Sequence, residues 1–453
     1  MAVVHRAILV IGLFLCVTGA VRVRGADSLK WSADKSKVTA DVQTWDLLTL
    51  LENVATATGW EIYVEPKTRY QASAKFKERP PGEALKMLLG NLSYALLPQT
   101  NGASKLYVFR NNRNDATQLV RGRKKSDKLD KELIVTMKAG GVLDTNALGA
   151  KVTGKIDKLN AYRLQFKDAA AAEEARKKLE GDENVDLVDS NYEIARPPNA
   201  ESLAVSAIPG LDLKIKPNPI GDGPIIGLID TVVQRGGGAR DGFLLPQISV
   251  AGEAAPADDE PTHGTAMTEN FLHALEMQNC DASNARILPV DIYGNMPSAS
   301  TFNLIDGLVK ALEGHVNIVN MSLGSTGGNE LTHRIIQEAS AKGVLFFGAA
   351  GNEHTTAPTY PAAYPEVTAV TAVDRNGKIA PYANYGEFVD VGAPGTAIVP
   401  FDGRSYVVMG TSPSTAWASG LAAGLMACGT QPSAIPAQMR SIMAVPPQDT
   451  GGR

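Results

Sequence analysis

Short apolar runs alternate with amphipathic stretches along the C-terminal half of the chain. Strands are predicted where these runs are rich in β-branched residues, at 224–229, 285–290, 317–321, 344–349 and 367–373. Helices are predicted where apolar or small residues recur at helical spacing, at 264–278, 301–313, 331–342 and 415–427. Because this alternation is typical of a parallel sheet with helices on both faces, we expect an α/β fold for residues 223–453.

A small α/β domain is predicted for residues 27–112. Thr44 is predicted to cap its first helix, which continues through Thr58 and ends at Gly59. The other predicted elements are strands at 37–42, 60–64 and 106–109 and a helix at 81–92. Their order resembles the short N-terminal domain of secretins and TonB-dependent receptors, and an unrelated small α/β domain fits the pattern equally well.

A second small α+β domain is predicted for residues 132–196. Its elements are strands at 133–137, 158–166 and 185–194 and an Ala-rich helix from Asp168 to Leu179. Residues 113–131 between the two domains are polar and basic without an apolar period, which predicts a linker. The basic cluster at 121–125 is either a solvated part of that linker or a processing site. Residues 197–222 then lead into the last domain.

The first 26 residues have the pattern of a secretory signal peptide. One early arginine precedes an apolar run at 7–20, and small residues follow it. An uncleaved membrane anchor is the alternative. We find no second apolar run long enough to span a membrane, so we expect an exported protein without a membrane span after signal removal.

Composition narrows the remaining classes of function. A net charge of -4 over 453 residues gives no reason to expect nucleic acid as a partner. Cys16 lies in the signal sequence, which leaves Cys280 and Cys428. These two could pair, but buried free thiols are the interpretation we favour.

Three polar residues stand where the predicted strands and helices of the last domain meet. Asp230 follows the first strand, His263 opens a helix, and Ser412 precedes the last one. A serine hydroxyl becomes a strong nucleophile when an imidazole takes its proton, and a buried carboxylate holds that imidazole in the required tautomer. The order Asp, His, Ser is one of those in which this triad occurs. We therefore predict these three residues to be catalytic.

The surrounding motifs resemble those of the subtilase family of serine peptidases. The matching stretches are Ile229-Asp230-Thr231, His263-Gly264-Thr265, Asn320-Met321-Ser322-Leu323-Gly324, Ala349-Ala350-Gly351-Asn352, 360–365, 392–395 and Gly410-Thr411-Ser412. The resemblance implies a subtilisin-like parallel sheet with helices on both faces. It also implies that Asn352 lies in the oxyanion hole, where one side-chain donor contributes about 3–4 kcal/mol. The implied substrate-binding residues are Ser322, Leu323, Gly324, Ala350 and Gly351.

Residues 132–196 are similar to the inhibitory propeptide that precedes many subtilases. The resemblance rests on the runs at 159–166 and 185–198 and on their place directly ahead of the catalytic motifs. It implies a folding chaperone and inhibitor whose C-terminal tail occupies the active-site cleft until it is cut. The chain's own propeptide is therefore an expected partner.

The sequence departs from the family at a few positions, none of which removes a reacting atom. Val232 stands where glycine is usual, so we expect a different local turn, because a β-branched residue does not tolerate glycine's unusual backbone angles. Pro413 and Ser414 follow the nucleophile, and proline is tolerated at the first helical position. The other departures are Ala416 in place of proline and Met267-Thr268-Glu269 after the histidine motif.

The other polar residues are given no catalytic role. His273 is expected on the surface or packed on its helix, and Asp291 resembles a structural position of the family. His315, His333 and His354 lack the spacing of a zinc site. Calcium commonly stabilises subtilases, but no acidic cluster identifies a site here, so we assign no cofactor. Glu353 is expected at the rim of the specificity pocket, where it would favour polar or basic substrate side chains.

The sequence thus predicts a serine endopeptidase that hydrolyses polypeptides through an acyl-enzyme. It is expected to be made as a self-processing zymogen and to be secreted or kept in the periplasm or cell envelope. The alternative is an inactive subtilase-like binding protein of the cell envelope. The complete set of Asp230, His263, Ser412 and Asn352 favours the enzyme.

Overall fold

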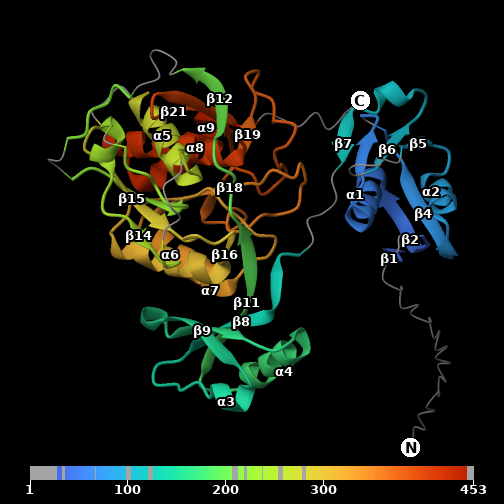
Figure 1. Cartoon of the computed structure of the whole chain (residues 1–453), viewed down its shortest axis with the longest axis horizontal. Coiled ribbons are helices and arrows are strands. Elements are labelled where there is room, and N and C mark those ends of the chain that lie inside the picture. The colour runs from blue at the N-terminus through green and yellow to red at the C-terminus, as the bar shows by residue number, and fades with distance from the viewer. Residues whose placement is uncertain are drawn as a thin grey trace, which may run out of the picture.

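The computed structural model describes most of the chain. The described residues are 28–32, 36–66, 68–97, 104–120, 126–206, 213–218, 222–236, 238–253, 259–277 and 282–445. The predicted signal peptide with Cys16, the basic cluster at 121–125 and Cys280 lie outside them. Two small domains precede a large C-terminal domain, and the second small domain lies against helices of the large one (Figure 1).

A parallel sheet forms the centre of the C-terminal domain. Its described strands, in order across the sheet, are β14 (Ile248–Ser249), β15 (Arg286–Asp291), β13 (Ile225–Asp230), β17 (Ile318–Met321), β18 (Leu345–Ala349), β19 (Val367–Val373) and β20 (Val391–Pro394). All neighbouring pairs are parallel. The predicted α/β fold is therefore confirmed. Because the strands are parallel, their carboxyl ends collect at one edge of the sheet, where sites form in such folds.

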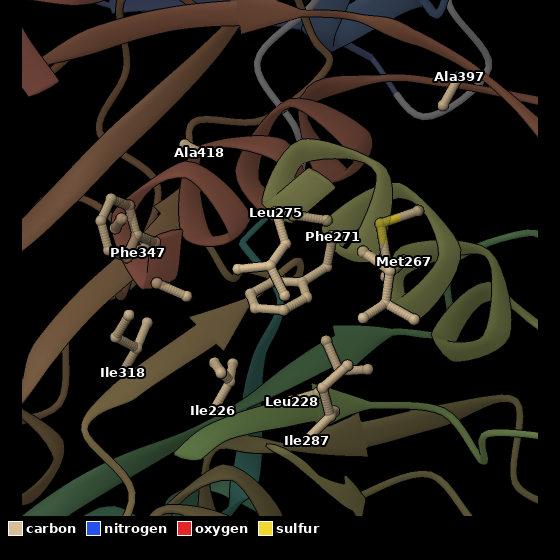
Figure 2. Packing of buried hydrophobic residues seen from close by; sticks show 14 of the residues in the cluster. Ile226, Leu228, Met267, Phe271, Leu275, Ile287, Ile318, Phe347, Ala397 and Ala418 are labelled. Carbon is tan, nitrogen blue, oxygen red and sulfur yellow. The ribbon is translucent and has the colours of Figure 1, made fainter. Parts of the chain in front are cut away.

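Helices cover both faces of this sheet. They are α5 (His263–Glu276), α6 (Thr301–Glu313), α7 (Glu330–Ser340), α8 (Thr411–Ala427) and α9 (Ile435–Ile442). Along β13, Ile226 and Leu228 pack with α5 and α8, whereas Ile229 packs with α6 on the other face. Figure 2 shows the first of these layers, in which Phe271 and Leu275 of α5 lie over the strands. Burial on both faces explains why the strands read as continuous apolar runs.

An antiparallel sheet lies beside the central one. Its strands run in the order β12 (Glu201–Ser206), β22 (Arg404–Met409) and β21 (Thr396–Phe401). β12 lies within residues 197–222, for which the sequence predicted only a connection to the C-terminal domain. It pairs with β22 through Glu201 opposite Val407 and Ser202 opposite Tyr406.

The first small domain has two sheets and two helices around one core. One sheet contains β1 (Ser28–Trp31), β2 (Val38–Asp46) and β4 (Gln71–Arg79); the other contains β5 (Ser93–Leu97), β6 (Lys105–Phe109), β3 (Glu61–Val64) and β7 (Gln118–Val120). The helices α1 (Leu47–Thr58) and α2 (Pro81–Leu89) bury leucines at helical spacing against these sheets. The strands β1, β4 and β5 were not predicted; all three lie at sheet edges and contain exposed or half-buried residues.

The second small domain is an antiparallel sheet with one long helix. Its elements are β8 (Lys128–Met137), α3 (Thr145–Leu148), β9 (Lys151–Ile156), β10 (Ala161–Gln165), α4 (Ala169–Glu180) and β11 (Val185–Ala195). Alternate residues of β8 face opposite ways: Leu133 and Val135 pack with α4, whereas Ile134 packs with the core that contains α6 and α7. β11 continues the sheet into the C-terminal domain by pairing with β16 (Ser298–Ser300).

Three predictions differ from the structure. The first helix is capped by Asp46, whose carboxylate accepts from Thr49 N at 3.0 Å, whereas Thr44 still belongs to β2. The linker predicted at 113–131 is shorter, because β7 adds to the first domain and β8 already begins at Lys128. Cys428 is disulfide-bonded rather than a free thiol.

Candidate active site

Asp230 and His263 form a buried pair at the carboxyl edge of the central sheet. Asp230 is the last residue of β13, and His263 is the first residue of α5. Nδ1 of His263 lies 2.8 and 2.9 Å from the two carboxylate oxygens of Asp230. The aspartate is fully buried and the histidine is 2% exposed. This contact places a hydrogen on Nδ1, so Nε2 is the ring nitrogen that can accept a proton.

A glycine lets α5 approach β13 this closely. A Cβ at Gly264 would lie 2.3 Å from the main-chain oxygen of Thr231. Gly264 N donates to Thr231 Oγ1 at 2.8 Å, and Thr262 Oγ1 donates to Val232 O at 2.6 Å. These bonds fix the first turn of α5, and with it His263, against the residues that follow Asp230.

Ser412 is the second residue of α8 and lines the same cavity as His263. The cavity has a volume of about 640 Å³. The Ser412 hydroxyl donates to Ser322 O at 3.2 Å, and the Ser322 hydroxyl donates to Ser412 O at 3.1 Å. In this state the serine is therefore bonded to Ser322 rather than to the imidazole. Because Ser412 lies in the first helical turn, its N–H has no partner within the helix and can face a ligand.

Asn352 lies beside the start of α8. Its Oδ1 accepts a hydrogen bond from Thr411 N at 2.9 Å, which makes Nδ2 the other, donor end of the amide. Gly410 makes room for it: a Cβ there would lie 3.2 Å from Nδ2, and the glycine has a φ of 144°. Asn352 and Ser412 both line the cavity. The arrangement puts a side-chain donor next to the serine N–H.

The other predicted site residues divide into two groups. Ser322, Leu323, Gly324 and Gly351 line the cavity, and so does Glu353. Ala350 is fully buried and lies outside the cavity lining, and its N–H bonds to Val370 O in the neighbouring strand.

Asn384 is a part of the site that the sequence analysis missed. Its Oδ1 accepts from Glu353 N at 2.9 Å, and its Nδ2 donates to Ala350 O at 2.8 Å. Glu353 in turn accepts from Asn352 N at 2.9 Å through Oε2. Asn384 thus holds the loop that carries Asn352. Its turn-rich context, Ala-Asn-Tyr-Gly, was the only sequence signal for it.

The local structure accommodates the residues at which the sequence departs from the family pattern. Val232 is absent from the residues with positive φ, so its turn does not require glycine. Pro413 is the third residue of α8 rather than the first, but it still lies in the turn where N–H groups have no helical partner. Glu269 is buried and bonds to Arg240 Nη1 at 2.6 Å. Burial raises the pKa of the Glu269 carboxyl, and the Arg240 charge opposes that rise.

A segment of the chain itself forms part of the cavity wall. On one side of it β11 pairs with β16, and Arg196 N donates to Pro297 O at 3.1 Å. On the other side β12 pairs with β22, and the intervening Ala200 N donates to Pro261 O at 3.4 Å. Residues 195–198 line the cavity together with His263 and Ser412. The segment between β11 and β12 therefore runs along the cavity that contains His263 and Ser412.

Where the structure describes them, the remaining histidines and acidic residues do not gather into a further centre. His333 Nε2 lies 2.9 Å from Glu366, and its ring stacks on Tyr364. His273 is partly buried on α5, and this burial lowers its pKa. In the described part of the chain, no group of three or more His, Cys, Asp or Glu residues could hold a metal ion. Among the helices that are described, none is long and apolar enough to cross a bilayer.

Comparison with known proteins identifies the family to which the chain belongs. Residues 221–445 match the Subtilase family, peptidase S8, and residues 114–191 match the fervidolysin N-terminal prodomain. The chain is 30% identical over 230 residues to thermitase of Thermoactinomyces vulgaris, which covers 49% of this chain and 81% of thermitase. It belongs to the subtilase family. This subtilase is a serine-type endopeptidase with an N-terminal prodomain, and its polypeptide substrates and its own prodomain are its partners.

One further relative and one solved structure each cover about half of the chain. The subtilase is 30% identical over 263 residues to the thermostable alkaline protease of Halalkalibacterium halodurans, which covers 54% of this chain and 68% of that relative. The solved structure of the prenylagaramide maturation protease PagA has 24% sequence identity and a TM-score of 0.43, over 54% of this chain and 92% of that one. The two family matches begin at residue 114, so the resemblance of residues 27–112 to the secretin domain stays a prediction.

The prodomain holds the enzyme through the start of α7. The carboxylate of Asp189 in β11 accepts from Leu331 N at 2.9 Å and from Glu330 N at 3.3 Å. Burial raises the pKa of Asp189, and these two hydrogen bonds oppose the rise. A carboxylate at this end of a helix also meets the favourable end of the helix dipole.

Asp189→Ala is expected to loosen this contact. The loss of an anionic acceptor at a helix N-terminus costs about 1 kcal/mol, or roughly a fivefold change in an opening equilibrium. The weaker contact is measured by hydrogen–deuterium exchange on the full chain, with Ser412→Ala present in every variant. Asp189→Ala is expected to show faster amide exchange over residues 329–332. Glu173→Ala, at an exposed position of α4, is the matched control. Equal exchange in both variants would contradict the assignment.

Proposed function

We propose that Asp230, His263 and Ser412 form the catalytic triad of this subtilase. The observation that carries the proposal is the buried contact of 2.8 Å between His263 Nδ1 and Asp230, beside the cavity that His263 shares with Ser412. A fully buried carboxylate fixes the imidazole tautomer and stabilises the imidazolium that forms during the reaction.

The proposed reaction proceeds through an acyl-enzyme. The Ser412 hydroxyl turns from Ser322 O to Nε2 of His263, which takes its proton while the oxygen attacks the substrate carbonyl. Asn352 Nδ2 and the Ser412 N–H stabilise the negative charge that develops on the carbonyl oxygen. His263 then gives the proton to the leaving amine, and a water molecule activated by the same imidazole releases the acyl group.

Substrates are proposed to bind as extended strands. β16 already accepts β11 as an antiparallel neighbour, which supports main-chain pairing on this side of the cavity. Ser322, Leu323 and Gly324 line the cavity next to Ser412, so the proposal keeps them as substrate-binding residues, with Gly351. Glu353 lies at the same cavity, and a preference for polar or basic side chains there stays a prediction. No cofactor is proposed.

The enzyme is further proposed to be a self-processing zymogen that acts outside the cytoplasm. Residues 195–198 line the cavity in the intact chain, beside the catalytic residues, which supports inhibition before cutting. The disulfide at Cys428 supports an oxidising compartment, since disulfides persist mainly in exported proteins. The signal-like pattern of residues 1–26 supports export in the same way.

A fluorophosphonate probe tests the proposal. Such a probe forms a covalent bond only with an activated serine, so the matured wild type is expected to be labelled and Ser412→Ala to stay unlabelled. Mass spectrometry of the labelled peptide identifies the serine. A matured wild type that takes up no probe would refute the proposal and favour the inactive binding protein.

A further inference from the structure

Arg196 is the best-held side chain of the segment that crosses the cavity. Its Nη1 donates to Gly294 O at 2.9 Å and to Met296 O at 3.0 Å, and its main-chain N donates to Pro297 O at 3.1 Å. The guanidinium carbon lies 5.8 Å from the centre of the Tyr293 ring. One short loop, residues 293–297, therefore offers three carbonyl oxygens and an aromatic ring to a single arginine.

A buried carboxylate adds to the attraction for a cation. Asp291, the last residue of β15, is fully buried, and its Oδ1 accepts from Tyr293 N at 2.9 Å and from Gly294 N at 3.0 Å. Its Oδ2 has no hydrogen-bond partner among the described residues. Burial raises the pKa of Asp291, and the two backbone bonds and the Arg196 charge oppose this rise. Asp291 thus shapes the loop that holds Arg196, while one of its own oxygens lacks a hydrogen-bond partner there.

The arginine has a fixed place relative to the catalytic pair. Arg196 is anchored at Pro297 on the β16 side, and Ala200 is anchored at Pro261, two residues before His263. After Ala200 the chain continues as β12 along β22. Between these two anchors lie residues 197–199, of which Pro197 and Pro198 line the cavity together with His263 and Ser412. A peptide bound in the same register would place this side chain a few residues ahead of its cleaved bond.

We propose that residues 293–297, backed by Asp291, form a guanidinium-binding subsite that selects substrates with an arginine on the amino side of the cleaved bond. The inference rests on the proposed function, because the arginine that enters the subsite belongs to the segment that lines the catalytic cavity. The prodomain tail fills this subsite with Arg196 in the intact chain. A substrate with arginine at the matching position competes for it after the prodomain has left.

Peptide competition tests the subsite. Peptides with the sequence of residues 191–203 and Arg, Ala or Glu at position 196 are added to the matured enzyme while it hydrolyses fluorescein-labelled casein. The arginine peptide is expected to inhibit with a Ki about tenfold lower than the alanine peptide, the ratio that charge-assisted hydrogen bonds typically give. The glutamate peptide is expected to bind more weakly than alanine. Ki values for Arg and Ala that agree within about twofold would overturn the proposal.

A variant of Asp291 tests whether the preference for arginine over alanine depends on this loop. Asp291→Asn keeps the oxygen that accepts from Tyr293 N and Gly294 N but removes the charge, so the Arg-to-Ala ratio is expected to fall to about threefold or less. Asp374→Asn, in an exposed turn after β19, removes the same charge elsewhere and is expected to keep the wild-type ratio. An unchanged ratio in Asp291→Asn would contradict the assignment.

The experiments distinguish a failure of the proposed triad from a failure of the proposed subsite. Casein hydrolysis and probe labelling report on the triad, whereas the ratio of peptide affinities reports on the subsite. If the matured protein did not hydrolyse casein, fluorescence anisotropy of the labelled peptides on the same protein would still give that ratio. Equal affinities on an active enzyme would refute the subsite alone.

Discussion

Ser412→Ala is expected to lower kcat for peptide hydrolysis by about 10⁶-fold, the size of effect known for loss of the nucleophile in such triads. The substitution removes one hydroxyl from the first turn of α8, where Ser412 contacts Ser322 through both its side chain and its carbonyl. The fold should persist, since alanine suits a helix and the Ser322 bond to the Ser412 carbonyl remains. Hydrolysis of labelled casein, followed with enough enzyme to detect the residual rate, measures the loss.

The same variant is expected to accumulate as a precursor that still carries residues 132–196. Expression in a protease-free host and intact-mass analysis show the form directly. Ser414→Ala is the matched control, because this buried serine lies on the same helix and its hydroxyl bonds to main-chain carbonyls including Ala393 O. Normal trimming of Ser412→Ala in that host would argue against self-processing, and a retained rate would refute Ser412 as the nucleophile.

Asp230→Asn is expected to lower kcat by about 10⁴-fold. The asparagine fills the same space, but its amide nitrogen would donate toward His263 Nδ1, which now lies 2.8 and 2.9 Å from carboxylate oxygens. The imidazole would then carry its hydrogen on Nε2 and could not accept the serine proton. Steady-state kinetics on a quenched peptide measures the loss, with Asp374→Asn as the control for removing one surface charge. A loss below about tenfold would show that Asp230 does not set the tautomer.

Much of the central sheet could be predicted because its strands are buried on both faces. The apolar runs at 224–229 and 285–290 correspond to β13 and β15, and the polar residues that follow them collect at one edge. The order of apolar and polar residues was therefore enough to place Asp230 at a strand end. The start of α5 was predicted at His263, where the structure places it, and Thr262 caps it there.

Features that depend on distant contacts could not be predicted. The run at 201–206 has no clear period, and it becomes β12 only because β22 offers an edge to it. Asn384 lies 32 positions after Asn352 in the sequence, and only the folded loop brings their hydrogen bonds together. The contacts of Arg196, the last residue of the predicted second domain, could not be predicted either. Its side chain binds main-chain carbonyls, which every residue type carries, so the sequence does not reveal them. The disulfide at Cys428 depends on geometry in the same way.

The strand pairing on both sides of the cavity has a consequence for the timing of activation. A cut within residues 197–200 would separate two chains that β11–β16 and β12–β22 still hold in place. The cut tail would still be held next to the cavity by these strands, so its effective concentration there would be high. It would therefore at first rebind faster than it dissociates from the enzyme. Chain cleavage and the appearance of activity would then be separate events. The lag between them would shorten on dilution or on a second cut that removes the released inhibitor.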